Sequence, residues 1–241
     1  MKMMNKNEID IIYDNLVKSG KRFDSFKWGD GSKFWIKRRE RFKLMHILKG
    51  HPAKAINREY AGIKVLKRCG IPAPNVVYKD ERCIVTEDVG PHLQDIAIDK
   101  RIGVAEKEKI FSSAGKIMAA LHTQRYAHGG LALRDVCWDG TAITLLDLES
   151  FDELIRSQRK LSIDFYLFIH SWFKLFETEK PELMAFVDAY KNNIIAVQWQ
   201  KSLDLPLYLQ ILSKLFTLLK YKKSDIIALT RTVNFLNKLK Q

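Results

Sequence analysis

Cysteine is scarce in this sequence and is never clustered. Its three cysteines, Cys69, Cys83 and Cys137, are widely spaced, and there is no C-x-x-C pair. Structural zinc sites need grouped ligands, and disulfide-stapled scaffolds need an even, closely spaced set of thiols. The spacing excludes both classes. We therefore expect reduced, mostly buried thiols in a cytoplasmic protein.

Long apolar runs are also missing. A bilayer-spanning helix needs roughly 20 apolar residues, and the longest candidate, Phe165 to Phe176, is interrupted by His170 and Lys174. The first ten residues, MKMMNKNEID, contain no apolar stretch of the signal-peptide kind. We expect neither a membrane-spanning segment nor a secretory signal.

The familiar nucleotide and nucleic-acid motifs are absent as well. There is no G-x-G-x-x-G and no Walker A pattern, and the glycines near the N-terminus, Gly20, Gly29 and Gly31, give only a weak signal for a loop that covers phosphates. No helix-turn-helix, RNA-binding aromatic motif or zinc finger is present. We expect no specific nucleic-acid partner.

Positive charge, by contrast, is abundant. The 241 residues include 41 Lys and Arg against 28 Asp and Glu, a formal net charge of +13. Such a balance favours anionic partners: nucleic acid, an anionic membrane face or phosphorylated substrates. A soluble protein with many lysines is the alternative. Basic residues cluster at Lys37 to Arg41 and Lys220 to Lys223, and we interpret them as solvated faces, with an anionic surface as their alternative partner.

The most informative stretch is HGGLALRDVCWDGTAITLLDLE, residues 128 to 149. Two short apolar runs, Val136 to Trp138 and Ile143 to Leu146, are joined by Asp139-Gly140, a strong hairpin-turn signal. Asp135 precedes the first run and Asp147 follows the second. Because a hairpin brings its open ends together, the sequence predicts that these two acids are neighbours.

This segment resembles the catalytic segment of the protein-kinase-like fold, in which an H-x-D-L-x-x-x-N loop leads through a hairpin to a D-F-G aspartate. Gly130 precedes Asp135 by five positions, and Asp147 follows Asp135 by twelve. The resemblance assigns the motif histidine to His128, the metal-binding asparagine position to Asp135 and the second metal ligand to Asp147. Gly130 stands where the family has its catalytic aspartate.

The N-terminal part predicts a helix and a hairpin. Residues Asn5 to Lys18 form an amphipathic pattern, and Lys21 to Arg39 predicts two strands turning at Trp28 to Gly31. Lys37 ends Trp35-Ile36-Lys37, which resembles the kinase V-A-I-K strand that supplies a phosphate-gripping lysine; a solvated strand end is the alternative. In that family the residue two before the lysine lies under the adenine ring and is small. With Trp35 there, either the pocket is reshaped or the register is different.

A helix from Pro52 to Cys69, closed by Gly70, carries the next candidate. Glu59 lies on the apolar face that Ile56, Ile63 and Leu66 form, and a buried carboxylate needs a partner. The resemblance implies Lys37 as that partner. Exposure of the carboxylate, or pairing with Arg58 or Lys67, is the alternative.

The string CIVTEDVG resembles the strand-to-hinge crossing of kinases, where the backbone from Glu87 to Val89 would bind adenine. It follows a predicted strand pair, Asn75 to Tyr78 and Arg82 to Thr86. Gly90-Pro91 is the expected boundary between an N-terminal lobe, residues 1–90, and a C-terminal lobe, residues 91–241.

The C-terminal lobe reads as mainly helical. We expect a helix from Glu106 to Tyr126 with His122 in a structural role, and a further helix opening at Ser162-Ile163-Asp164. The resemblance implies that Asp164 accepts hydrogen bonds from the catalytic-loop backbone; an acid at a helix N-terminus is the other interpretation. Further helices are predicted to begin at Pro181, at Asp204-Leu205-Pro206 and at Ser224-Asp225, and the short stretch Ser150 to Lys160 takes the activation-segment position.

The ordered set of Lys37, Glu59, Glu87, His128, Asp135, Asp147 and Asp164 covers most of the chain. Together with the L-L-D-L-E ending of the hairpin, it looks most like the bacterial lipopolysaccharide core kinases of the Kdo and heptose kinase type. The resemblance implies an α+β, two-lobed protein-kinase-like fold, with a small antiparallel sheet and one helix in the N-lobe and a mainly helical C-lobe. It also implies ATP and Mg²⁺ as cofactors.

The implied activity is transfer of the ATP γ-phosphate to a sugar hydroxyl of an anionic, lipid-linked or small-molecule acceptor. The resemblance also implies a cytoplasmic location, with peripheral contact to the inner face of the cytoplasmic membrane. Three explanations of Gly130 stay open. Another acid, Asp139 or Glu149, substitutes for the missing aspartate; the acceptor needs no strong base; or the protein is a pseudokinase that binds a nucleotide or a partner without turnover.

Overall fold

The chain divides into two compact units. The structure, a computed structural model, describes residues 4–39, 55–153, 159–204 and 224–241. Unit 1 comprises Met1–Gly90 and Thr144–Ser150, and unit 2 comprises Pro91–Ile143 and Phe151–Gln241. The first boundary lies at Gly90-Pro91, where the sequence suggests one. The seven residues from Thr144 to Ser150, which a single division at that point would give to the C-terminal lobe, are part of unit 1.

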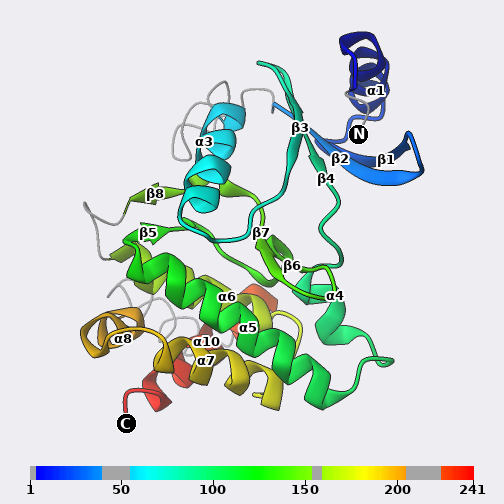
Figure 1. The fold of residues 1–241 in the computed structure, drawn as a ribbon. Coiled ribbons are helices and arrows are strands. Elements are labelled where there is room, and N and C mark those ends of the chain that lie inside the picture. The colour runs from blue at the N-terminus through cyan, green and yellow to red at the C-terminus, as the bar shows by residue number, and fades with distance from the viewer. Residues whose placement is uncertain (1–3, 40–54, 154–158, 205–223) are drawn as a thin grey trace. The chain divides into compact units, whose positions relative to one another are not determined.

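Unit 1 contains a four-stranded antiparallel sheet in the order β1-β2-β4-β3 (Figure 1). The strands are β1 (Phe23–Trp28), β2 (Ser32–Arg38), β3 (Val76–Lys79) and β4 (Cys83–Glu87). Both predicted strand pairs are present. The first turns through Gly29 and Gly31, whose φ angles of 65° and 92° fall in the left-handed region that glycine adopts without strain.

Helix α1 (Lys6–Lys18) packs on one face of this sheet. Asn5 caps it, since its side chain accepts from the Glu8 N–H while Glu8 bonds back to the Asn5 N–H. The buried residues of α1 join alternate residues of β2 and β4 in one apolar cluster, which contains Ile9, Leu16, Phe34, Ile36, Cys83 and Val85. Because side chains alternate along a strand, Lys33, Trp35 and Lys37 lie on the other face of β2.

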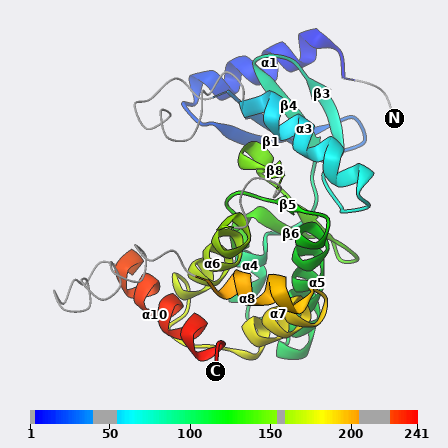
Figure 2. The same ribbon diagram turned by 90° about the vertical axis from the view of Figure 1, so that its left-hand side faces the viewer.

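Helix α3 (Ala55–Arg68) lies in unit 1 on the side of the sheet opposite α1 (Figure 2). Its apolar residues Ile56, Ile63 and Leu66 are buried, as the periodicity predicts. Glu59 on the same face is 7% exposed. The helix therefore delivers a carboxylate to the face of β2 that carries Lys37.

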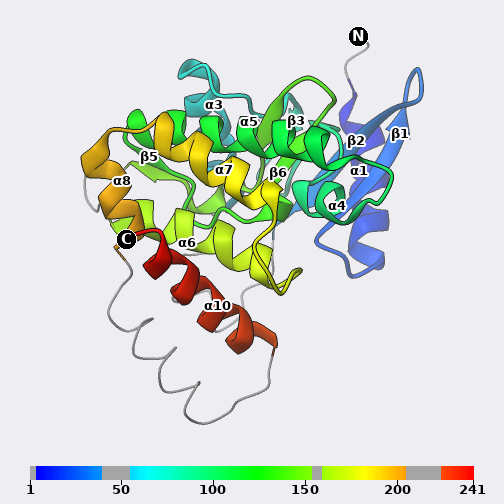
Figure 3. The same ribbon diagram turned by 90° about the horizontal axis from the view of Figure 1, so that it is seen from below.

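Unit 2 is mainly helical. Among the described residues of this unit, the helices are α4 (Leu93–Ile98), α5 (Val104–Thr123), α6 (Arg159–Phe173), α7 (Pro181–Asn192), α8 (Ala196–Leu203) and α10 (Ser224–Lys238). Helices α5 and α7 run side by side (Figure 3). Gly115 permits their close approach, because a Cβ there would overlap the Phe186 carbonyl oxygen and lie 3.0 Å from the Ala189 Cβ.

Short strands complete the fold. β5 (Tyr126–Ala127) pairs with β8 (Asp152–Glu153), and β6 (Val136–Trp138) pairs with β7 (Ile143–Leu145). The hairpin predicted at Asp139-Gly140 is thus confirmed. Between Ala132 and β6, residues Leu133–Asp135 form a 3₁₀ helix, and Leu148–Ser150 form another after β7.

Some boundaries differ from those that the sequence predicts. Helix α6 begins at Arg159 rather than at Ser162, so Asp164 lies inside the helix and is not a terminal acid. Helix α5 begins at Val104 rather than Glu106 and ends at Thr123 rather than Tyr126, while α4 and α8 were not predicted. Some predictions concern positions outside the described residues. These are the helix starts at Pro52 and Leu205-Pro206, the Lys220–Lys223 cluster, the Arg41 end of the other basic cluster and part of the activation-segment stretch.

Among the helices that the structure describes, none combines the length and the apolar character that crossing a bilayer would require.

Candidate functional site

Lys37 lies at the centre of a cluster of carboxylates within unit 1. Its Nζ is 2.8 Å from Glu59 Oε2, 2.7 Å from Asp147 Oδ1 and 2.7 Å from Glu149 Oε1. The contact with Asp147 is a hydrogen bond, and the contacts with Glu59 and Glu149 are ion pairs. We call these four residues the lysine cluster. The ion pair between Lys37 and Glu59 that the resemblance implies is present, and Asp147 joins it.

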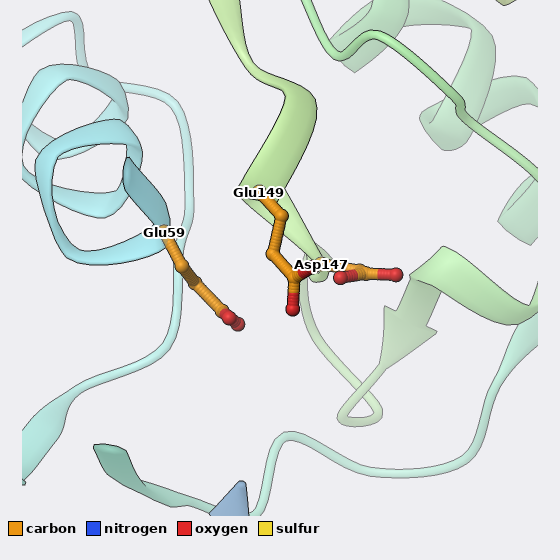
Figure 4. Close-up of side chains that lie close together, drawn as sticks. All are labelled: Glu59, Asp147 and Glu149. Atoms are coloured by element: carbon orange, nitrogen blue, oxygen red, sulfur yellow. The ribbon is translucent and has the colours of Figure 1, made fainter. Parts of the chain in front are cut away.

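Three separate segments build the lysine cluster: β2 supplies Lys37, α3 supplies Glu59, and the segment after β7 supplies Asp147 and Glu149. Figure 4 shows the three carboxylates. Glu149 is the contact that the sequence did not predict. Its carboxylate also forms an ion pair with Arg22, and its main-chain oxygen accepts from Arg58 Nε at 2.9 Å. Glu149 therefore connects the start of β1, helix α3 and the end of β2.

Asp147 has an unusual backbone conformation. Its φ of 59° lies in the left-handed region, which is uncommon for a residue other than glycine. The turn that this angle produces leads directly into the 3₁₀ helix that carries Glu149. The Asp147 side chain is 44% exposed, so a ligand can reach it while it contacts Lys37.

The carboxylate oxygens of the lysine cluster fit a divalent cation such as Mg²⁺. One carboxylate oxygen from each of Glu59, Asp147 and Glu149 lies within 4.8 Å of the other two. Oxygen ligands of this type are the ones that Mg²⁺ prefers. The exposed Asp147 is the member that can meet an ion without dismantling the contact between Lys37 and Glu59.

Glu87 and Val89 lie at and after the end of β4, also in unit 1. The Glu87 N–H donates to the Asn75 carbonyl oxygen at 3.0 Å, and its carboxylate accepts from the Asn75 amide at 2.8 Å. The next residue, Asp88, bonds through its N–H to the Lys33 carbonyl oxygen at 3.1 Å. These contacts fix the segment beside β2. Its predicted role in binding adenine stays a prediction.

In unit 2, a buried carboxylate holds the loop that carries His128, Gly129 and Gly130. The Asp164 side chain accepts from the main-chain N–H groups of these three residues, at 2.6, 2.9 and 3.0 Å. The hydrogen bonding that the resemblance implies for Asp164 is confirmed. His128 is 1% exposed, so its ring is part of the packing of this loop.

Asp164 is fully buried and is further supported by His122, whose Nε2 lies 3.4 Å from it. Burial alone would raise the pKa of the Asp164 carboxyl, but the hydrogen bonds and charges of His122 and His128 hold that pKa below its ordinary value. His122 Nδ1 lies 2.7 Å from the Tyr190 hydroxyl. His122 thus has the structural role that we expected.

Asp135, the predicted metal ligand of unit 2, is 6% exposed and ends the 3₁₀ helix before β6. Its carboxylate accepts from the Ala132 N–H at 2.9 Å and lies 3.7 Å from Arg134 Nε. Because Asp135 belongs to unit 2 and Asp147 to unit 1, their predicted proximity and shared metal stay predictions.

The two acids considered as substitutes for the missing aspartate have other partners. The Asp139 carboxylate accepts from Ala142 and Thr141, which lowers its pKa, and so it caps the hairpin turn. Glu149 Oε1 contacts both Lys37 and Arg22, so this carboxylate is already paired with two cations. Both carboxylates are therefore already engaged by other groups, which makes each a poor general base.

Gly130 itself is not required by packing. A Cβ at this position would meet no atom within 4 Å, and its φ lies outside the left-handed region. The backbone would therefore accept an aspartate here without strain.

Comparison with known proteins supports the fold. No protein-family model matches the sequence. A protein of Haemophilus influenzae strain Rd, described only as uncharacterised, is 28% identical over 207 residues, which is 84% of each chain. The solved structure of WaaP in complex with acyl carrier protein superposes with a TM-score of 0.52 and 14% identity, covering 98% of this chain and 99% of that one. WbdD, solved with the kinase inhibitor LY294002, gives a TM-score of 0.48 at 17% identity; the match covers 75% of this chain and about half, 48%, of that chain.

The WaaP similarity extends over nearly the whole of both chains, and at 14% identity it establishes the fold. The chain has a kinase-like fold with a small antiparallel sheet followed by a mainly helical part. The fold class expected from the resemblance to lipopolysaccharide core kinases is therefore confirmed.

Proposed function

We propose that this protein is an ATP-dependent phosphotransferase of the lipopolysaccharide-kinase-like type. It would transfer the γ-phosphate to a sugar hydroxyl of a lipid-linked or small-molecule acceptor. The observation that carries the proposal is the lysine cluster, in which one ammonium group contacts the α3 carboxylate and the carboxylate after β7 at 2.8 and 2.7 Å. Kinase-like folds use this combination to grip phosphates and their metal.

The roles follow from the contacts. Lys37 would bind the α- and β-phosphates, with Glu59 holding its ammonium group in place. Asp147, which is exposed and in contact with Lys37, would hold the metal, and Asp135 stays the further metal ligand that the resemblance implies. A bound Mg²⁺ supplies charge neutralisation on the phosphates. The resemblance places the nucleotide base at the main chain from Glu87 to Val89, and the buried His128 would shape the loop before Asp135.

The acceptor is inferred from charge. With a net charge of +13 the chain favours an anionic acceptor and peripheral contact with an anionic membrane face at the cytoplasmic side. The WaaP structure contains acyl carrier protein, so a carrier protein is a further candidate partner for this chain.

Gly130 favours a second function, a nucleotide-binding module without turnover. A positioned general base typically contributes about a hundredfold to ten-thousandfold to a rate. The described contacts of Asp139 and Glu149 make both poor replacements. The lysine cluster would still bind nucleotide, because none of its members depends on residue 130.

Thermal unfolding with and without ATP and Mg²⁺ tests the nucleotide site. A ligand that binds only the folded state stabilises it by about 2.7 kcal/mol at a hundred times its dissociation constant. We expect a magnesium-dependent shift in the wild type that Asp147→Asn loses. Glu81→Gln, an exposed change in the same unit, should keep it. No shift in the wild type at saturating ATP and Mg²⁺ would refute both functions.

Restoring the aspartate separates the two functions. Because the backbone at residue 130 accepts a side chain, Gly130→Asp should fold like the Gly130→Ala control. If the protein is a kinase that is slow because residue 130 supplies no general base, Gly130→Asp raises magnesium-dependent ATP consumption by about a hundredfold or more. Binding without turnover in both variants would support the module instead.

A further inference from the structure

Trp35 stands in an unusual place on the face of β2 that carries Lys37. Phe34 and Ile36 are buried against α1, so Trp35 and Lys37 point together to the other face. The contact between Lys37 and Glu59 identifies Lys37 as the lysine of the cluster. Trp35 is therefore the residue two positions before it, and of the two alternatives raised by the sequence, a changed register is excluded.

The indole of Trp35 is held in place from several sides. Its Nε1–H donates to Asp88 Oδ1 at 2.5 Å, and Asp88 also forms an ion pair with Lys33 at 3.0 Å. The Lys33 ammonium group lies 4.7 Å from the centre of the indole ring, and the Phe23 ring packs on it at 6.3 Å. A cation over an indole face is an attractive contact. Trp35 is thus an anchored ring rather than a mobile side chain.

The indole is anchored at the segment where the resemblance to kinases places the nucleotide base. Asp88 is the middle residue of Glu87 to Val89, and Lys37 is about 7 Å from Trp35 along the strand, at roughly 3.3 Å per residue. A purine that reached this segment while its phosphates reached Lys37 would have to cross β2 at residue 35. An indole is a fused bicyclic ring of nearly the same size as a purine, and its N–H already bonds to Asp88.

We propose that Trp35 takes the position of the nucleobase, so that the site binds its ligand through the magnesium-bound polyphosphate and discriminates poorly between bases. This inference rests on the proposed function, since it assumes that Lys37 binds phosphates. It makes Trp35 the specificity-determining residue of the site. It also assigns a second role to Asp88 and Lys33, which keep the indole in place.

Calorimetric titration of the full chain with three magnesium-saturated ligands, ATP, GTP and inorganic tripolyphosphate, tests the proposal. In the wild type we expect the three dissociation constants to agree within about threefold, a difference of roughly 0.6 kcal/mol. Trp35→Val keeps a strand-forming residue and removes the ring. It should tighten ATP binding about tenfold or more and leave tripolyphosphate binding unchanged.

Two further variants serve as a control and as a substitute for Trp35→Val. Trp28→Phe changes a tryptophan of the same sheet that packs on the α1 side, and it should change none of the affinities. If Trp35→Val does not fold, Asp88→Ala removes the acceptor of the indole N–H and the ion-pair partner of Lys33, and should likewise favour ATP over tripolyphosphate.

The outcomes distinguish failure of this inference from failure of the proposed function. Tight, base-selective ATP binding by the wild type that Trp35→Val weakens would mean that the indole stacks on the base, which overturns the inference and leaves the proposed function intact. No binding of any of the three ligands by the wild type, by Trp35→Val or by Asp88→Ala would refute the proposed function and the inference together.

Discussion

Replacement of Asp164 by alanine should destabilise unit 2 severely. The carboxylate accepts three main-chain N–H groups at 2.6 to 3.0 Å and is completely buried, with His122 beside it. A hydrogen bond to a charged group contributes about 1.5–3 kcal/mol, and each buried donor left without an acceptor costs about 1–3 kcal/mol. Because these terms share one residue they do not add fully, and disruption of a buried charged network typically costs about 3–5 kcal/mol. We expect a loss in this range.

For a chain of this length, 1 kcal/mol shifts the melting temperature by about 2–4 °C, so Asp164→Ala should lower it by about 10 °C. Asp164→Asn keeps one acceptor oxygen and should lose roughly half as much. Asp188→Ala on α7 changes an exposed aspartate of the same unit and serves as the control. Calorimetry or circular dichroism measures all three. A shift for Asp164→Ala no larger than that for Asp188→Ala would refute the claim that this carboxylate holds the loop.

The other predictions concern packing and pH. Gly115→Ala would gain about 1 kcal/mol of helix propensity. It should nevertheless lower the unfolding free energy by about 1–3 kcal/mol, because its Cβ would overlap the Phe186 carbonyl oxygen. An unchanged or higher stability in urea would show that α5 and α7 separate easily. Burial, with Lys174 nearby, lowers the pKa of His170. As pH falls below about 6.5 the unfolded chain therefore binds this proton first, and stability declines. His170→Gln should lose less stability than the wild type between pH 7 and pH 5, and equal losses in urea titrations would contradict the assignment.

Elements whose signals are local could be predicted from the sequence. Asn5 with Glu8 encodes a helix start, and Asp139-Gly140 encodes a turn, because each signal operates over a few residues. Glu59 could be predicted as buried because its helical neighbours are apolar. The boundaries of α5 and α6 were less well predicted, since Gly103 caps α5 without a side-chain hydrogen bond and α6 begins with two cationic residues.

The missed contacts depend on distant pairs. Glu149 meets Arg22 across 127 positions of sequence, and no periodicity or turn signal encodes such a pairing. Helix α4 spans only six residues, and its N-cap residue, His92, makes no side-chain capping bond. The two-residue strands β5 and β8 are separated in the sequence by residues 128–151 and are too short for any alternation to appear. These features follow from tertiary packing and not from local propensity.

The membership of Thr144–Ser150 in unit 1 has a consequence for biosynthesis. When a ribosome has released the first 90 residues, the nascent chain contains Lys37 and Glu59 but neither Asp147 nor Glu149. The ammonium group then has one of its three carboxylate partners, and Arg22 has no Glu149 to meet. Unit 1 can complete its ionic cluster only after residue 150 has emerged, when more than half of unit 2 is still to be made. A truncated fragment ending at Gly90 would consequently be an unfinished unit, and maturation of the two units is interleaved along the nascent chain.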